Sequence, residues 1–284
     1  MMELGNWRLG TEIAAGRWAN VCVASPIDGL SPQVDYVIKY VDPLSDGSEF
    51  ARSMLWREHA CAELVSHPNL ISFLDEDLTA NTPFLVSARI QGDSIQQVLE
   101  VEKLAGRQAS PLRFEDRLMF FRQICEGLQA LHQEQIRHGD IAPRNLIVDR
   151  QSGQATIIDL GLSEKVQPFI RATQSLAGSL GYIAPECVKG NDPVTVSADI
   201  YSLGQTMKEF FCQPGEIGES NDDSSDAVFS GPVTQSVAPI PGLYQLLNAM
   251  TRLHPLRRPT IESIFSQVAL LEIESIQPFR RWAA

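Results

Sequence analysis

Cysteine is scarce in this chain, and basic side chains are few relative to acidic ones. The 284 residues include five cysteines, which are scattered, odd in number and without a C-x-x-C pair. A disulfide framework or a zinc site is therefore not expected, whereas a reducing compartment is. The 23 lysines and arginines against 35 acidic residues leave a net charge of -12. This charge argues against nucleic acid and anionic membranes as partners, because both attract basic surfaces.

Long apolar runs are also missing. No stretch approaches the roughly 18 apolar residues of a membrane-spanning helix. The N-terminal MMELGNWRLG lacks the basic region and apolar run of a signal peptide. We therefore expect a cytoplasmic protein with no membrane partner. Hydrophobic residues still make up 44% of the chain, which is enough for the core of one large domain or two compact lobes.

The first 88 residues favour strands. Short β-rich runs occupy residues 17–24, 35–41 and 82–88. The first two runs flank a turn rich in Pro, Gly and Asp, which predicts an antiparallel hairpin. Residues 49–66 have the apolar spacing of a helix, and this helix should end before His67-Pro68.

Beyond Gly92 the pattern becomes helical. Helices are predicted over residues 114–135, 197–211, 243–252 and 261–274, with two short strands, NLIV and ATII, after the first of them. Residues 213–239 are acidic, rich in Ser, Gly and Pro, and without Lys or Arg, which indicates a surface insert. A β-rich front and a helical back predict an α+β fold with two lobes.

The second half of the chain contains three polar residues, Asp140, Asn145 and Asp159, whose spacing matches two motifs of one known family. The sequence His138-Gly139-Asp140-Ile141-Ala142-Pro143-Arg144-Asn145 resembles the catalytic loop H-R-D-x-x-x-x-N of protein kinases. Nineteen residues after Asp140, Asp159-Leu160-Gly161 is similar to the D-F-G motif. The resemblance implies that Asp140 accepts or orients the proton of a substrate hydroxyl. It also implies that Asn145 and Asp159 hold Mg²⁺, which prefers oxygen ligands.

The resemblance extends to a cation in the first half. Lys39 follows apolar residues in the strand-like Tyr36-Val37-Ile38-Lys39, and Glu58 lies ten residues before the Pro of H-P-N-L. This is the spacing of the lysine and helix glutamate that form an ion pair in protein kinases, and it implies that Lys39 and Glu58 are catalytic.

A nucleotide site is implied around this lysine. Residues 14–21, AAGRWANV, resemble the Gly-rich loop G-x-G-x-x-G-x-V, with Ala at the first and third Gly positions. Ser87 falls at the gatekeeper position behind the adenine, where a small side chain would open a back pocket. The implied ATP-binding residues are Ile13, Ala14, Gly16, Ala19, Val21, Val37, Lys39, Ala88, Arg89 and Ile147.

Further motifs carry the resemblance over residues 5–275, with an N-lobe over about 5–88 and a C-lobe over about 89–275. G-S-L-G-Y-I-A-P-E at 178–186 resembles the end of the kinase activation segment, and Asp199 stands where an aspartate braces the catalytic loop. Arg258 should pair with Glu186. Together the motifs imply a bilobal protein kinase that transfers the γ-phosphate of Mg-ATP to Ser or Thr hydroxyls of a protein substrate.

Two departures from the family pattern bear on regulation and acceptor. Gly139 replaces the arginine that normally receives an activation-loop phosphate, so activity should not require phosphorylation of Ser163, Thr173 or Ser175. Ala142 replaces the lysine typical of Ser/Thr kinases, and Arg144 can supply the catalytic cation, as in tyrosine kinases. The G-S-L-G-Y-I-A-P-E stretch favours Ser/Thr over Tyr.

Two other functions compete with this interpretation. The H-G-D sequence also occurs in small-molecule kinases of the aminoglycoside or choline type, but these generally lack the A-P-E segment and its arginine partner. A pseudokinase or scaffold would fit the Ala-substituted loop, Gly139 and Ala142. Such a protein has no physical reason to keep Lys39, Asp140 and both metal ligands.

Overall fold

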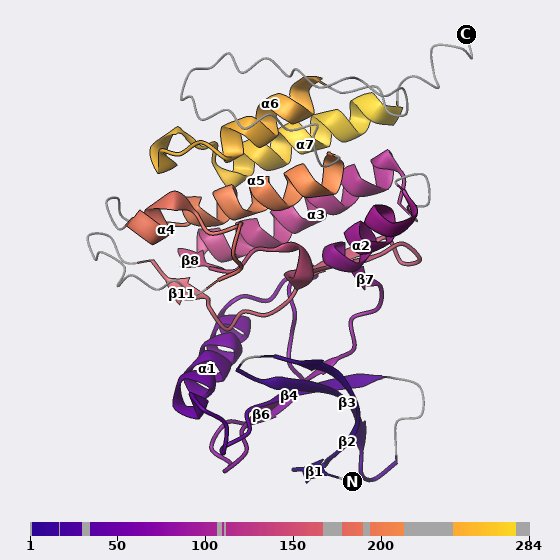
Figure 1. The fold of residues 1–284 in the computed structure, drawn as a ribbon, viewed down its shortest axis with the longest axis vertical. Helices are drawn as coiled ribbons and strands as arrows, with labels where there is room; N and C mark the ends of the chain where they lie inside the picture. Colours follow the sequence, from indigo (N-terminus) through magenta and orange to yellow (C-terminus); the bar gives the residue numbers. More distant parts are fainter. Residues whose placement is uncertain are drawn as a thin grey trace.

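The computed structural model describes residues 2–16, 18–29, 35–106, 110, 112–166, 178–189, 194–212 and 241–276. These residues form two lobes, one built around a β-sheet and one mainly of helices (Figure 1). The α+β, bilobal fold predicted from the sequence is confirmed. The acidic segment 213–239, Thr173 and Ser175 lie outside the described residues.

The N-lobe sheet has six strands in the order β1-β2-β3-β4-β6-β5, and all neighbours are antiparallel. The predicted hairpin is present as β3 and β4. The strand before it, β2, was not predicted, although it forms the other side of the nucleotide loop. The strands are β1 (Glu3–Leu4), β2 (Trp7–Ala15), β3 (Asn20–Pro26), β4 (Tyr36–Tyr40), β5 (Asp75–Asp77) and β6 (Phe84–Ala88).

The register of β3, β4 and β6 sorts the side chains onto two faces. Cys22, Ile38 and Val86 are cross-strand partners on a face that forms its own buried cluster with Trp7. Lys39 pairs with Val21 and Leu85 on the opposite face. Helix α1 (Ser48–Leu64) packs on that face through a second buried cluster that includes Leu85. Alternation along the strands therefore turns Lys39 toward the helix.

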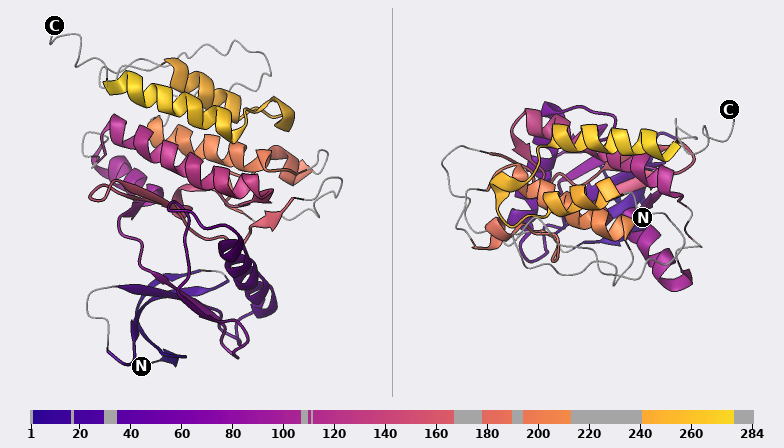
Figure 2. Two further views of the ribbon diagram at one scale, coloured as in Figure 1. Left: turned by 180° about the vertical axis from the view of Figure 1, so that it is seen from behind. Right: turned by 90° about the horizontal axis from the view of Figure 1, so that it is seen from above.

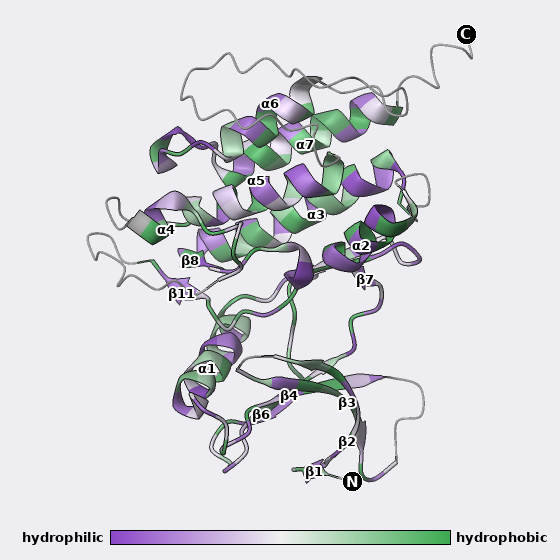
Figure 3. Ribbon diagram, in the orientation of Figure 1, coloured by the Kyte–Doolittle hydropathy of each residue, from purple (hydrophilic) through white to green (hydrophobic). Residues whose placement is uncertain are grey.

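The C-lobe is built on α3 (Phe114–Gln133), whose apolar side is fully buried. Figure 2 shows that α6 and α7 stack on α3 and α5 on the side away from the sheet, while α1 lies beside the sheet. Hydrophobic and hydrophilic residues alternate around these helices (Figure 3), so one side of each joins a single core. The remaining helices are α2 (Ile95–Ala105), α4 (Pro185–Lys189), α5 (Ser197–Phe211), α6 (Pro241–Met250) and α7 (Ile261–Ile276).

The C-lobe also contains short strands and 3-10 turns. The strands are β7 (Asp93–Ser94), β8 (Ile136–Arg137), β9 (Leu146–Asp149), β10 (Gln154–Ile157) and β11 (Glu164–Lys165), and the 3-10 turns are η2 (Pro143–Asn145) and η3 (Pro255–Arg257). Strands β9 and β10 match the predicted pair NLIV and ATII. Helix α2 was not predicted. It begins with a capping box in which Ser94 and Gln97 satisfy each other's backbone N–H groups.

All five cysteines are free, and four of them are buried. Burial raises the pKa of the Cys61 thiol to about 11, despite a hydrogen bond with Ser163. The pKa of the Cys125 thiol is also raised by burial. No helix among the described residues is long and apolar enough to cross a membrane.

Candidate active site

Lys39 links the two lobes. Its ammonium lies 2.7 Å from Glu58 Oε2 on α1 and 2.7 Å from Asp159 Oδ1, which follows β10. Burial lowers the pKa of Lys39, but attraction to the two carboxylates outweighs it and raises the pKa overall. Lys39 therefore stays charged, and the pairing predicted between Lys39 and Glu58 is present.

The two carboxylates differ in environment. Glu58 is almost fully buried, and desolvation raises its pKa even though Lys39 opposes the shift. Asp159 keeps about a third of its side chain exposed. Desolvation would raise its pKa, but the charge and hydrogen bond of Lys39, together with His138 and the Gly161 N–H, lower it. Asp159 also has φ 64°, a left-handed conformation that is uncommon for residues other than glycine. This backbone geometry turns an ionised carboxylate toward Lys39.

Asp140 is held by four donors. Oδ1 accepts from the N–H and the hydroxyl of Ser179 at 2.8 and 2.7 Å. Oδ2 accepts from Arg144 Nη2 at 2.6 Å and from Asn145 Nδ2 at 2.9 Å. The Asp140 carboxylate is thus fixed from two sides, by Arg144 and Asn145 of its own loop and by Ser179 of the segment before α4.

Asp199, at the start of α5, holds the backbone of the loop that precedes Asp140, as its motif implied. Its buried carboxylate accepts from the backbone N–H groups of His138 and Gly139 at 2.8 and 3.0 Å, and from His132 Nε2 at 3.0 Å. Gly139 has φ +82°, and a Cβ atom there would lie 2.7 Å from the carbonyl oxygen of Leu162. Position 139 is therefore suited to glycine in this chain.

The predicted metal ligands fit a divalent cation in chemistry and placement. Asn145 donates its Nδ2 to Asp140, which leaves Oδ1 as the amide atom free to ligate. The N–H of Ile158 donates to the Asn145 carbonyl at 2.9 Å, so Asn145 and Asp159 stand on adjoining chain segments. Two such oxygen donors, with phosphate and water oxygens, suit Mg²⁺. No cluster of three or more His, Cys, Asp or Glu that could hold another metal occurs among the described residues.

The ladder between β4 and β6 decides which backbone groups can meet an adenine. Arg89 donates its N–H to the Asp35 carbonyl at 2.8 Å, so this predicted donor is already engaged. Antiparallel pairs alternate, and the next pair, Tyr36 and Ala88, directs its backbone groups away from each other. Ala88 is therefore the better of the two candidates. Ser87 beside it is buried.

The remaining nucleotide candidates lie on β2, β3 and β4, in the turn between β2 and β3, and in β9. Ile13 and Ala14 are exposed on β2, while Val21, Val37 and Ile147 are half-buried. The N–H of Gly16 donates to the Ala19 carbonyl at 3.0 Å, closing a tight turn. A Cβ atom at Gly16 would lie 2.8 Å from that oxygen. The single glycine thus stands where the turn needs it, and alanines suffice on either side.

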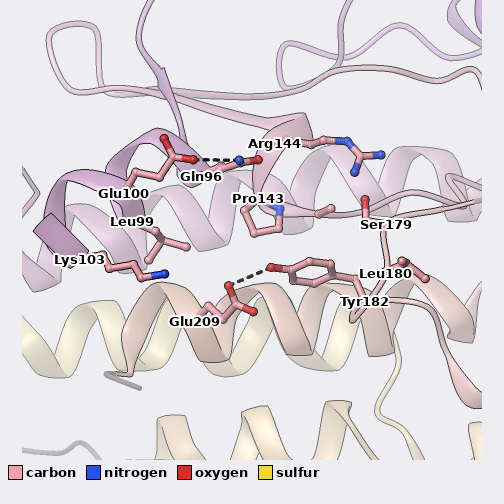
Figure 4. A pocket seen from close by; sticks show the side chains of 11 residues that line it. Gln96, Leu99, Glu100, Lys103, Pro143, Arg144, Ser179, Leu180, Tyr182 and Glu209 are labelled. Carbon is pink, nitrogen blue, oxygen red and sulfur yellow. Dashed lines mark hydrogen bonds between the residues drawn. The ribbon is translucent and has the colours of Figure 1, made fainter. Parts of the chain in front are cut away.

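A groove with a volume of about 350 Å³ lies on the C-lobe (Figure 4). Arg144 and Ser179, both bonded to Asp140, lie on its wall. Tyr182 donates its hydroxyl to Glu209 on α5 at 2.9 Å and closes one side. Its lining residues are Gln96, Leu99, Glu100, Lys103, Ala142, Pro143, Arg144, Ser179, Leu180, Tyr182 and Glu209.

Sequence reasoning assigned no role to several of these residues. Ser179 stood inside a recognised motif, which was the available signal, but its bonds to Asp140 were not foreseen. Glu209 carries no motif at all. By contrast, the ion pair expected between Arg258 and Glu186 is present as a bidentate contact with distances of 2.6 and 2.8 Å, fully buried.

Comparison with known proteins agrees with this geometry. The sequence profile of the protein kinase domain matches residues 30–268. The chain is 27% identical over 222 residues to a SNF-related serine/threonine-protein kinase of Rattus norvegicus, covering 76% of the chain and 28% of that protein. It is 29% identical over 206 residues to the serine/threonine-protein kinase PrkC of Bacillus subtilis (strain 168), covering 72% and 30%. CBL-interacting protein kinase 24 of Oryza sativa subsp. japonica is 25% identical over 266 residues, covering 92% and 56%.

The relatives are longer than this chain. The chain spans less than a third of the length of the first two relatives, so it corresponds to one portion of each. The profile match covers most of the sequence, including Lys39, Glu58 and the loop around Asp140. The chain belongs to the protein kinase family.

Proposed function

We propose that this chain is a serine/threonine protein kinase, with residues 5–275 forming a single kinase domain. The observation that carries the proposal is the position of Lys39, 2.7 Å from both Glu58 and Asp159. A pseudokinase or scaffold has no use for a half-buried lysine with two carboxylate partners in a chain that also holds Asp140 in a fixed orientation. The relatives named as serine/threonine kinases support the choice of acceptor.

Each residue has a role in the proposed transfer. Mg-ATP, when bound, supplies the transferable phosphoryl group and the charge compensation of the metal. Asn145 and Asp159 offer oxygen atoms to the metal, and Lys39 offers a cation to the phosphates. The substrate hydroxyl bonds to the γ-phosphorus as the bond to the bridging oxygen breaks, ADP leaves with that electron pair, and the proton passes to Asp140.

Arg144 supplies a second cation near Asp140. Half of its side chain is exposed toward the groove, and Nη2 already touches Asp140 Oδ2. A lysine two residues after the catalytic aspartate is absent here, because that position is Ala142, which is buried. We assign Arg144 the task of neutralising charge on the phosphoryl group.

The groove beside Asp140 suits an extended segment of a protein substrate that presents its hydroxyl to the carboxylate. Its volume of about 350 Å³ and its open mixture of polar and apolar side chains support this use. The free cysteines support the cytoplasm as the location, since a reducing compartment keeps thiols unpaired.

The test is direct. The purified chain is incubated with Mg-ATP and casein or myelin basic protein, and mass spectrometry locates any phosphate, with Asp140→Asn run beside it. We expect phosphoserine or phosphothreonine that disappears in the variant. Phosphotyrosine would contradict the assignment of Ser and Thr as the acceptor residues. ATP binding without transfer would favour a pseudokinase or a small-molecule kinase.

A further inference from the structure

Arg137 occupies a junction between three segments. It stands in β8, three residues before Asp140, and faces Glu164 across the β8–β11 ladder. Its Nη2 forms an ion pair with Glu164, and Nη1 lies 3.8 Å from Cys187 Sγ on α4. Glu164 follows Asp159 by five residues. One guanidinium therefore touches both the start and the end of the segment that runs from Asp159 to α4.

The ladder that brings these groups together is too short to hold by itself. Strands β8 and β11 have two residues each, and a pair of such strands is marginally stable without side-chain help. Further bonds are the N–H of Val166 to the Gln135 carbonyl at 2.8 Å and the hydroxyl of Ser163 to the His138 carbonyl at 3.3 Å. The Arg137 side chain, about 15% exposed, is the charged part of this connection.

The guanidinium has little room for an external anion. The cavity beside it, lined by Arg137, Gly139, Cys187 and Asp199 among others, has a volume of about 10 Å³. That space holds about one water molecule, far less than a phosphate group needs. Glu164 already supplies the carboxylate partner, and Asp199 adds a second negative charge nearby. Position 139 cannot provide a cation, because it is glycine.

We propose that Arg137 and Glu164 form a built-in clamp that keeps the catalytic loop and the segment after Asp159 in the catalytic arrangement without a phosphate on the chain. Both are positioning residues, and the proposal rests on the proposed kinase function. It gives a physical reason for a kinase without the loop arginine to be active as synthesised. The Glu164 carboxylate takes the place of an activation-loop phosphate as the anion that holds the segment, and it is part of the chain from synthesis onward.

The first arm of the test asks whether phosphate matters. The full chain is treated with a broad-specificity phosphatase until its intact mass is that of the unmodified sequence, and the phosphatase is removed. We expect the initial rate of transfer to casein to match the untreated chain within about twofold, with no lag. A lag, or a rate more than about tenfold lower that recovers as the chain incorporates phosphate, would overturn the proposal.

The second arm tests the pair itself by a double-mutant cycle of Arg137→Gln and Glu164→Gln, with Arg137→Lys as the conservative variant and Arg8→Gln as the control. Arg8 pairs with Glu3 on the exposed edge of the other lobe. We expect about a tenfold loss of kcat in each single variant and no greater loss in the double variant. Arg137→Lys should stay within about threefold of wild type and Arg8→Gln should be unchanged. Additive losses would overturn the proposal. A charge-reversed pair is avoided, because a carboxylate at position 137 would face Asp199.

Hydrogen exchange gives a readout that does not depend on activity. In Arg137→Gln the amides of residues 160–166 and 185–188 should exchange at least about tenfold faster, while those of α6 and α7 stay unchanged. Unchanged exchange at 160–166 would overturn the clamp even if the protein proved inactive. Absence of transfer by treated and untreated wild type would contradict the proposed function alone, and the exchange data would still decide the clamp.

Discussion

Ser179 bonds to Asp140 twice through one carboxylate oxygen, with its backbone N–H at 2.8 Å and its hydroxyl at 2.7 Å. Arg144 and Asn145 occupy the other oxygen. All the strong acceptor positions of Asp140 are thus taken, and an incoming hydroxyl has to displace a donor.

Replacing Ser179 should separate substrate binding from chemistry. In Ser179→Ala the N–H bond remains, but the segment that lines the groove loses a hydrogen bond to a charged group, worth about 1.5–3 kcal/mol. We expect KM for the protein acceptor to rise about tenfold with a smaller change in kcat, and Ser179→Thr to behave like wild type. Steady-state kinetics with varied acceptor measure both. A change confined to kcat would argue against this role.

Lys39→Met should abolish transfer while leaving the fold intact. The variant removes the cation shared by Glu58 and Asp159, and we expect kcat/KM to fall by at least about 10²-fold. Circular dichroism should show an unchanged helical content. The matched control is Arg8→Met, which deletes an exposed cation of the same lobe and should keep full activity. Substantial residual transfer in Lys39→Met would remove Lys39 from the proposed site.

Arg144 should matter by charge rather than by shape. We expect Arg144→Ala to lower kcat about tenfold to a hundredfold, since it removes a cation beside the proposed phosphoryl site. Arg144→Lys should retain most of the activity because it keeps the charge, although it loses the planar contact with Asp140. The comparison of kcat in the three proteins checks the assignment. Equal losses in Ala and Lys variants would indicate a packing role instead.

Gly139→Ala should destabilise the protein more than Gly29→Ala. Both glycines have a positive φ, but only at Gly139 would the added Cβ atom also clash with the backbone. Gly29 has φ +68°, and a Cβ atom added there would have no atom within 4 Å, whereas at Gly139 the Cβ atom would lie 2.7 Å from a backbone oxygen. We expect Gly29→Ala to cost about 1 kcal/mol and Gly139→Ala about 1–3 kcal/mol beyond that. Urea unfolding of the two variants gives the difference. Equal costs would show that the loop around Leu162 relaxes freely.

Asp199 should make stability depend on pH in the acid range. Burial would raise its pKa, but the hydrogen bond and charge of His132 outweigh burial and lower it. A carboxylate with a lowered folded pKa stabilises the protein above its unfolded pKa of about 3.9, and this contribution is lost as pH falls through the folded value. Wild type should therefore lose its advantage over Asp199→Asn in free energy of unfolding progressively as pH falls below about 5. If the difference in free energy of unfolding between wild type and Asp199→Asn did not change with pH, Asp199 would not be an ionised, hydrogen-bonded carboxylate in the folded protein.

Much of the site could be predicted because its residues occupy fixed places relative to strong local signals. Glu58 was identified by its spacing to the turn at Pro68, and that spacing is preserved because α1 is one unbroken helix. Asp140 and Asp159 were identified by their motifs, and the antiparallel pair β9–β10 sets Asn145 beside Ile158, the residue before Asp159.

Other features of the fold and the site could not be predicted, because they depend on strand pairing and long-range contacts that local sequence patterns do not encode. The engagement of the Arg89 N–H follows from the parity of the β4–β6 ladder, which only the pairing of the strands fixes. Helix α2 was not predicted, because its apolar face is short: only Ile95 and Val98 are buried. Arg137 gave no signal, since an arginine at the end of a two-residue strand becomes informative only when Glu164 and Cys187 are seen beside it.

The burial of the native thiols has a practical consequence for labelling. Alkylating reagents attack the thiolate, and pKa values of about 11 at Cys61 and Cys187 leave almost none of it at neutral pH. A cysteine introduced at Leu180, which is 89% exposed on the rim of the groove, should react far faster than these two. A fluorophore placed there would report occupancy of the groove without first removing Cys61 or Cys187.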